Sequence, residues 1–224
     1  MLIVHHLNNS RSQRVLWLLE ELGVPYEVHL HQRDAKTMLA PPALLAVHPL
    51  GKSPVIVDGD LTIAETGAIV EYLIDRFGEG RLRPPAGTQD HLRYRYWLHF
   101  AEGSAMPPLL LTLVFNQIKT APMPFIVKPI ARGIANKVMD SFVRPNLTRQ
   151  FDFFEAELTK SPYFAGKALS GADVMMSFPL EAAAQRGGLT AANYPKCLDY
   201  LKRIQARPAY ARALSRGGPY DFVN

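Results

Sequence analysis

Three short polar segments near the N-terminus have residue types that suit the binding of a small charged molecule. The first is Asn9–Ser12, which offers amide and hydroxyl groups at an expected helix start. The second is Lys52–Pro54, and the third is Glu65-Thr66. Backbone N–H groups at a helix start attract a carboxylate, while Glu65 offers the negative charge that a ligand ammonium needs. The plainer interpretation is that these residues only cap helices and face solvent.

Alternating strand and helix signals predict how these polar segments are positioned. Short apolar or alternating runs indicate strands, and longer apolar runs ended by glycine indicate helices. The order predicts a βαβ unit followed by a ββα unit, with each polar segment at a strand end or a helix start. The segments are strands at Leu2–Leu7, Tyr26–His31, Val55–Val57 and Leu61–Ile63, and helices at Val15–Leu22, near Pro42–Val47 and at Thr66–Phe77.

The rest of the chain reads as helical. A Gly-, Pro- and Arg-rich stretch separates it from the first unit, so we expect a domain over residues 1–79, a linker over 80–88 and an all-α domain over 89–224. Ser170–Asp173 has the spacing of a helix-capping box. Prolines interrupt the chain over Ala121–Pro129. The expected helices are Thr88–Lys119, Ile130–Lys160, Ser170–Gln185 and Tyr194–Ala206.

Charge and composition exclude several classes of function. The chain has 224 residues and a formal net charge of +5, but its basic residues are scattered among 20 acidic ones. The densest basic cluster is Arg93–Arg95, so no nucleic-acid partner is expected, although a positive field favours an anionic small substrate. The apolar run Leu109–Phe115 is too short to cross a bilayer, so no membrane partner is expected.

Metal and disulfide chemistry are also not expected. Cys197 is the only cysteine, which excludes an intrachain disulfide and disfavours a cysteine-based metal site. His5 and His6 are adjacent in a strand and therefore point to opposite faces of the sheet. A single cysteine fits a reducing compartment, and the first residues lack the pattern of a signal peptide, so we expect a cytoplasmic protein.

Taken together, four motifs in this order and spacing resemble those of the glutathione S-transferase family over essentially the whole chain. The motifs are Ser12–Gly23, Gly51–Val55, Glu65–Leu73, and Phe164-Ala165-Gly166 followed by Ser170–Asp173. Trp17–Glu21 and the insert Ala121–Pro129 are similar to the branch found in fungi and bacteria. The resemblance implies a thioredoxin-like N-terminal domain, an all-α C-terminal domain, a homodimer, and glutathione as co-substrate without a metal.

The resemblance also implies how glutathione would bind. Glu65 and Thr66 would hold the γ-glutamyl head group. The Ser53–Pro54 bond would be cis, exposing the Ser53 backbone to pair with the cysteinyl part as an added strand does; from the residues alone, an ordinary trans proline is favoured. Lys52 would meet the glycine carboxylate, with assistance from His48.

The thiol of glutathione needs a donor because the thiolate is the nucleophile, and a free thiol is only a few per cent ionised at neutral pH. The first strand contains no tyrosine, and the turn that precedes the first helix contains no cysteine. When the chain is aligned with the family it resembles on Arg14-Val15, the serine position of several classes falls on Asn9, with Ser10 next to it. The resemblance therefore favours Ser10 as the catalytic donor, with Asn9 close behind it. Arg11 and Ser12 are weaker candidates, and the serines could simply cap the helix.

The predicted function is a glutathione transferase that conjugates glutathione to hydrophobic electrophiles and also reduces organic peroxides. Leu7, Met106, Leu110 and Phe115 are expected to line the electrophile pocket. Two alternatives stay open, which are a non-catalytic binding or interaction module of the same fold and a glutathione-dependent disulfide reductase.

Overall fold

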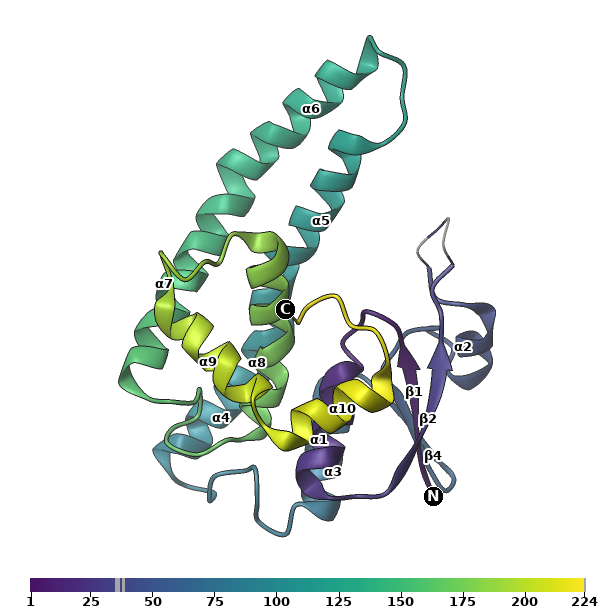
Figure 1. Ribbon diagram of the computed structural model, residues 1–224, viewed down its shortest axis with the longest axis vertical. Coiled ribbons are helices and arrows are strands. Elements are labelled where there is room, and N and C mark those ends of the chain that lie inside the picture. The colour runs from purple at the N-terminus through teal and green to yellow at the C-terminus, as the bar shows by residue number, and fades with distance from the viewer. Residues whose placement is uncertain (35–36, 38, 224) are drawn as a thin grey trace.

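The N-terminal third of the protein is built on a four-stranded mixed sheet. A computed structural model describes residues 1–34, 37 and 39–223 of the chain (Figure 1). The strand order is β2-β1-β3-β4, with β1 parallel to β2 and antiparallel to β3. This arrangement followed by helices confirms the predicted fold class. The strands are β1 (Leu2–Leu7), β2 (Tyr26–His31), β3 (Val55–Asp58) and β4 (Leu61–Ala64).

Three helices accompany the sheet, namely α1 (Gln13–Leu22), α2 (Pro42–Val47) and α3 (Thr66–Phe77). Almost all of α1 is buried, which explains why its sequence is apolar on nearly every side. Gly23 ends α1 in the left-handed conformation, with φ of 72°, and thereby allows the chain to turn back into β2. The polar turn that precedes α1 therefore lies at the end of the central strand β1.

The C-terminal half is entirely helical within the described residues. Residues 78–88 connect it to α3. Each of the two long helical runs contains a π-helical turn, and a third such turn continues α8. The elements are α4 (Gln89–Phe100), η1 (Ala101–Ala105), α5 (Met106–Thr120), α6 (Val127–Val138), η2 (Met139–Val143), α7 (Arg144–Lys160), α8 (Gly171–Ala182), η3 (Ala183–Gly187), α9 (Pro195–Gln205) and α10 (Pro208–Gly217).

One helix, α10, is missing from the sequence prediction. It packs against α1, where Tyr210 meets Trp17 edge-on with ring centroids 5.4 Å apart. Pro208 occupies the first turn, and Ala209, Tyr210 and Ala213 form its buried stripe. The period of that stripe and the N-terminal proline are the signals that could have identified this helix.

Helix α8 is the centre of the molecule, and every residue in it is buried. Ser170 and Asp173 form the predicted capping box at its start. Gly171 permits a close approach, because a Cβ there would lie 2.6 Å from the Ile74 side chain of α3. Helix α8 thus joins the sheet domain to the helical bundle.

Helices α5 and α6 form a hairpin that extends well beyond the rest of the molecule (Figure 1). The continuous run Gln89–Thr120 is long and apolar enough to pass a length-and-composition test for a membrane span. The apolar run Leu109–Phe115 is part of this longer helix. Its first half contributes Tyr94, Trp97 and Leu98 to the protein core.

Candidate functional site

A cleft lies between the sheet domain and the helical domain. Its volume is about 820 Å³, and it is bordered by the turn before α1, the segment before β3, helices α5 and α8, and the C-terminal segment. Most polar lining groups come from the sheet domain, and the helices with the C-terminal segment contribute the larger apolar share together with Thr112, Asn116 and Arg186. This division suits a polar ligand on one side and an apolar ligand on the other.

The predicted thiol turn forms the floor of the cleft. Asn9, Ser10 and Arg11 line it, whereas Ser12 is fully buried beneath it. Ser10 is 5% exposed, so little besides its pocket-facing surface is accessible. Among the hydroxyl groups of this turn, the one on Ser10 is therefore the one placed to meet a ligand.

A chain of hydrogen bonds supports Ser10 from below. The Ser10 and Ser12 hydroxyl oxygens are 2.8 Å apart, and Ser12 Oγ lies 2.8 Å from His6 Nδ1. Burial lowers the pKa of His6 to about 4, although the Gly217 carbonyl opposes this shift. His6 is thus neutral near pH 7, with the Gly217 carbonyl accepting from one ring nitrogen, so that Nδ1 accepts from Ser12. This row of hydrogen bonds fixes the turn from the side that faces the protein core.

Asn9 is held by the C-terminal segment. Its Nδ2 donates to Asp221 Oδ2 at 2.7 Å, and its Oδ1 accepts from the Asp221 backbone N–H at 2.8 Å. Asn9 also adopts a positive φ of 50°, which asparagine tolerates better than most residues. Asp221 thereby fixes the side-chain amide of Asn9, one of the two predicted thiol donors. The bond to Asp221 uses only one of the two Nδ2 hydrogens of Asn9.

The Ser53–Pro54 peptide bond is cis, as the resemblance implies. Ser53 Oγ donates to the His5 carbonyl at 2.8 Å and accepts from the Leu7 backbone N–H at 3.2 Å, so the side chain is tied to β1. Within the described residues, no protein group hydrogen-bonds to the Ser53 backbone N–H or C=O. Both groups can therefore pair with an extended peptide, and Ser53 itself lines the cleft.

Lys52 lines the cleft beside this turn, whereas His48 does not. His48 follows α2, and its Nδ1 accepts from the Leu50 backbone N–H at 3.3 Å. Lys52 is consequently the better placed of the two for a ligand carboxylate, and the position of His48 suits a role in shaping the loop.

Glu65 and Thr66 lie at the start of α3, outside the lining of the cleft. Glu65 is exposed and has a positive φ of 69°, so its side chain is turned outward at the helix start. Thr66 is 4% exposed, and its hydroxyl accepts from Arg14 Nη2 at 3.3 Å. These two residues form a separate polar site that is joined to the thiol turn through Arg14.

Arg14 connects the sheet domain with the helical domain. It is 1% exposed, and its Nη2 lies 2.5 Å from a Glu102 oxygen. The other Glu102 oxygen pairs with Arg11 at 2.8 Å. Burial opposes the charge of Glu102, but Arg14 and Arg11 together hold its pKa below the ordinary value. Glu102 belongs to η1, and single π-helical turns are frequent at functional sites.

The electrophile wall consists mainly of apolar side chains. Leu7, Met106 and Leu110 line the cleft, and Phe115 lies outside the lining, partly buried against the core. Sequence reasoning missed the contribution of α8, η3 and the chain end, by which we mean the C-terminal segment over residues 218–223. Their apolar character alone carries no sign that they meet at this cleft. These additional lining residues are Phe178, Ala182, Arg186 and Phe222.

Among the described residues there is no group of three or more His, Cys, Asp or Glu side chains able to hold a metal ion. In the sheet, His5 Nδ1 lies 3.0 Å from His31 Nε2. Burial, together with His31 and His29, lowers the pKa of His5 to about 4.

Comparison with known proteins gives consistent matches. The profile of the glutathione S-transferase N-terminal domain matches residues 10–76, and that of the C-terminal domain matches residues 117–208. Glutathione S-transferase 1 of Saccharomyces cerevisiae is 35% identical over 215 residues, which cover 93% of this chain and 92% of the yeast protein. Two solved structures are also similar.

The first is a glutathione S-transferase from Actinobacillus pleuropneumoniae, which is 32% identical with a TM-score of 0.80 and covers 99% of this chain and 95% of its own. The second is a sphingomonad glutathione S-transferase complexed with glutathione, which is 23% identical with a TM-score of 0.73. The superposition with the sphingomonad structure covers 96% of this chain and 98% of that chain, and at this identity it shows the shared fold alone.

Proposed function

Because this chain belongs to the glutathione S-transferase family, we propose that it binds glutathione, holds it as a thiolate and adds that thiolate to hydrophobic electrophiles. Organic-peroxide reduction is a second reaction of the same thiolate. The proposal includes a cytoplasmic location, where glutathione is the abundant thiol, and a homodimeric assembly.

One observation carries this proposal. A single cleft brings together the Ser10 hydroxyl, the unpaired backbone groups of Ser53 beside the cis proline, and an apolar wall from the helical domain. A peptide paired with Ser53 as an added strand would place its central residue at the end of β1, where the thiol turn begins. The apolar wall then receives the second substrate on the open side of the sulfur.

The charged groups of glutathione each have a partner of opposite charge in this arrangement. Glu65 attracts the γ-glutamyl ammonium, and the N–H groups at the start of α3 attract the adjacent carboxylate. Lys52 attracts the glycine carboxylate. The thiolate lies at the start of α1, where the helix dipole and the Ser10 hydroxyl both favour negative charge over the neutral thiol.

The chemistry then needs little more than orientation and charge stabilisation. In conjugation, the thiolate sulfur forms a bond to the electrophilic carbon, and the leaving group departs with the bonding electron pair. In peroxide reduction, the sulfur takes one peroxide oxygen to form glutathione sulfenic acid, and the alcohol leaves after protonation. A second glutathione converts the sulfenic acid to glutathione disulfide and water.

The test is a substrate panel with a binding control. Purified protein is retained on immobilised glutathione and then assayed with a chloronitrobenzene, cumene hydroperoxide and a mixed disulfide. The proposal expects turnover of the chloronitrobenzene, with weaker turnover of the hydroperoxide. Retention without turnover of any of the three would favour a non-catalytic binding module, and turnover of the disulfide alone would favour a reductase.

A further inference from the structure

The electrophile side of the cleft contains an arginine that no part of glutathione requires. Arg186 lies on the π-helical turn η3, which continues α8, and it lines the cleft together with Phe178 and Ala182 of α8. Its guanidinium carbon lies 4.7 Å from the centroid of the Phe222 ring. Arg186 therefore belongs to the apolar wall and not to the polar edge of the sheet domain.

The charge of the cleft has one sign. The charged side chains that line it are Arg11, Arg33, Lys52 and Arg186, and no aspartate or glutamate of the described residues belongs to the lining. Arg11 is already paired with Glu102 at 2.8 Å. For Arg186, by contrast, the described part of the chain offers no carboxylate within ion-pair distance, and its contact is with the ring of Phe222. An arginine in a cleft without a neutralising acid is a binding group for an anion.

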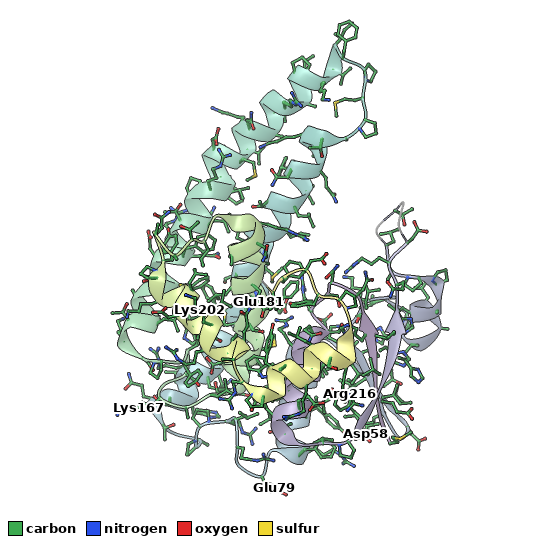
Figure 2. The ribbon with its side chains drawn as sticks, viewed as in Figure 1. Asp58, Glu79, Lys167, Glu181, Lys202 and Arg216 are labelled. Atoms are coloured by element: carbon green, nitrogen blue, oxygen red, sulfur yellow. The ribbon has the colours of Figure 1, made fainter. Side chains whose placement is uncertain are left out.

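The C-terminal segment contacts the exposed side chain of Arg186 through Phe222. The Phe222 ring packs 5.1 Å from that of Phe178, and the residues before it are bonded on both sides of the cleft. Tyr220 donates to Glu181 at 2.7 Å, and the Asp221 backbone N–H donates to Asn9. Figure 2 labels Glu181 on α8, and the C-terminal segment runs close beside it.

The contact with Phe222 leaves the hydrogen-bonding groups of Arg186 unused. The guanidinium carbon lies over the Phe222 ring, and a cation over an aromatic face is attracted by the ring without any N–H donor. A guanidinium presents its N–H donors as a fork that can form two parallel hydrogen bonds to a carboxylate.

From these observations we propose that Arg186 binds a carboxylate on the second substrate, so that the preferred electrophile is an apolar molecule carrying one anionic group. This inference rests on the proposed function, since it assigns the substrate class of the same cleft. Glutathione does not compete for Arg186, because its own charges are met by Glu65, the start of α3 and Lys52 on the sheet domain.

A matched pair of electrophiles tests the inference. 4-Chloro-3-nitrobenzoate and its methyl ester both lose chloride when the glutathione sulfur bonds to the ring, and they differ in one negative charge. For each compound, kcat/KM is divided by the rate constant of the uncatalysed reaction with glutathione at the same pH. We expect this normalised value to favour the acid in the natural protein.

Substitutions then assign the preference to Arg186. Arg186→Ala should lower the acid-to-ester ratio by roughly tenfold, the effect of one charge-assisted contact. Arg186→Lys should keep part of the preference, and Arg149→Ala, which removes an exposed arginine of α7, should leave the ratio unchanged. An unchanged ratio in Arg186→Ala, with both compounds still turned over, would overturn the inference and leave the proposed function standing.

A binding measurement decides the inference even if the protein proves not to be catalytic. The two glutathione conjugates formed from this pair are titrated into the natural protein and Arg186→Ala by calorimetry. Tighter binding of the carboxylate conjugate, lost in the variant, supports the anion site. Equal affinities of both conjugates in both proteins contradict it. Failure of the proposed function would instead appear as absent turnover of the whole substrate panel.

Discussion

The two sides of the cleft are built in different ways. On the glutathione side, Ser53 hydrogen-bonds directly to His5 of β1. Ser10 is bonded to Ser12, whose hydroxyl donates to the Leu7 carbonyl at the end of β1 or to His6 Nδ1. On the electrophile side, the wall is assembled from α5, η3 and the chain end, which are far apart in the sequence. One side is a rigid extension of a strand, and the other side depends on how separate helices pack.

This difference has a functional consequence. Hydrogen bonds to a central strand provide an edge that tolerates little change. A wall of packed side chains can change residue by residue while the fold is retained. The two sides meet at Arg14, Arg11 and Glu102, which is where the comparison can be tested most strongly.

The largest effect is expected from breaking that junction. Glu102→Ala removes the acid that neutralises Arg14, which is 1% exposed, and so leaves a buried uncompensated charge. The expected loss is about 3 kcal/mol of unfolding free energy, measured by urea titration. Asp140→Ala, which removes the exposed ion pair with Arg144, is the matched control and should cost well under about 1 kcal/mol. Equal losses in the two variants would show that the junction is not important for stability.

A slightly smaller effect is expected from the buried histidine beneath the thiol turn. The pKa of His6 falls from 6.5 in the unfolded chain to about 4 in the fold, chiefly through burial, so its contribution to stability is complete above pH 6.5. That contribution declines as the pH falls toward 4, because the unfolded chain then binds the proton more readily. By pH 4.5 the loss amounts to about 2 to 3 kcal/mol.

His6→Asn keeps an acceptor for Ser12 and removes the titration. Urea unfolding at pH 7.5 and pH 4.5 should therefore show a smaller acid-induced loss in this variant than in the natural protein. His99→Asn, at an exposed position, should lose as much stability as the natural protein. The interpretation fails if His6→Asn and His99→Asn have the same dependence on pH.

The third effect concerns the polar site at the start of α3. Glu65→Ala removes the charge that faces the glutathione ammonium, so calorimetry should show glutathione affinity reduced by about 10- to 100-fold. Glu71→Ala, an exposed acid farther along the same helix, should bind glutathione as the natural protein does. Unchanged affinity in Glu65→Ala would separate α3 from the glutathione site.

The same comparison explains what could be predicted from the sequence. The strands, α1 and α3, and the polar turns between them follow from local signals, since glycine ends α1 and polar residues precede both helices. The expected capping does not form, because the side chains of the N-cap residues Ser12 and Glu65 make no capping hydrogen bond. The cis bond at Pro54 did not follow from the residues, and only the family resemblance indicated it.

The electrophile side was predictable only in part. Leu7, Met106 and Leu110 were expected to line the cleft and do so. Phe115 lies outside the lining and packs against the core. Arg186, Phe178 and Phe222 reach the cleft because α8 is buried and α10 returns the chain end across it. Contacts of this kind depend on tertiary packing, and no local pattern specifies them.

The most direct test is the ionisation of bound glutathione. Ultraviolet absorbance of the thiolate is followed against pH in the complexes formed by the natural protein and by Ser10→Ala. We predict that the pKa of the bound thiol lies about 1 to 2 units below its ordinary value of about 8.5. In Ser10→Ala the pKa should rise most of the way back to the ordinary value. A bound thiol that titrates with the pKa of free glutathione would contradict activation by the Asn9–Ser12 turn.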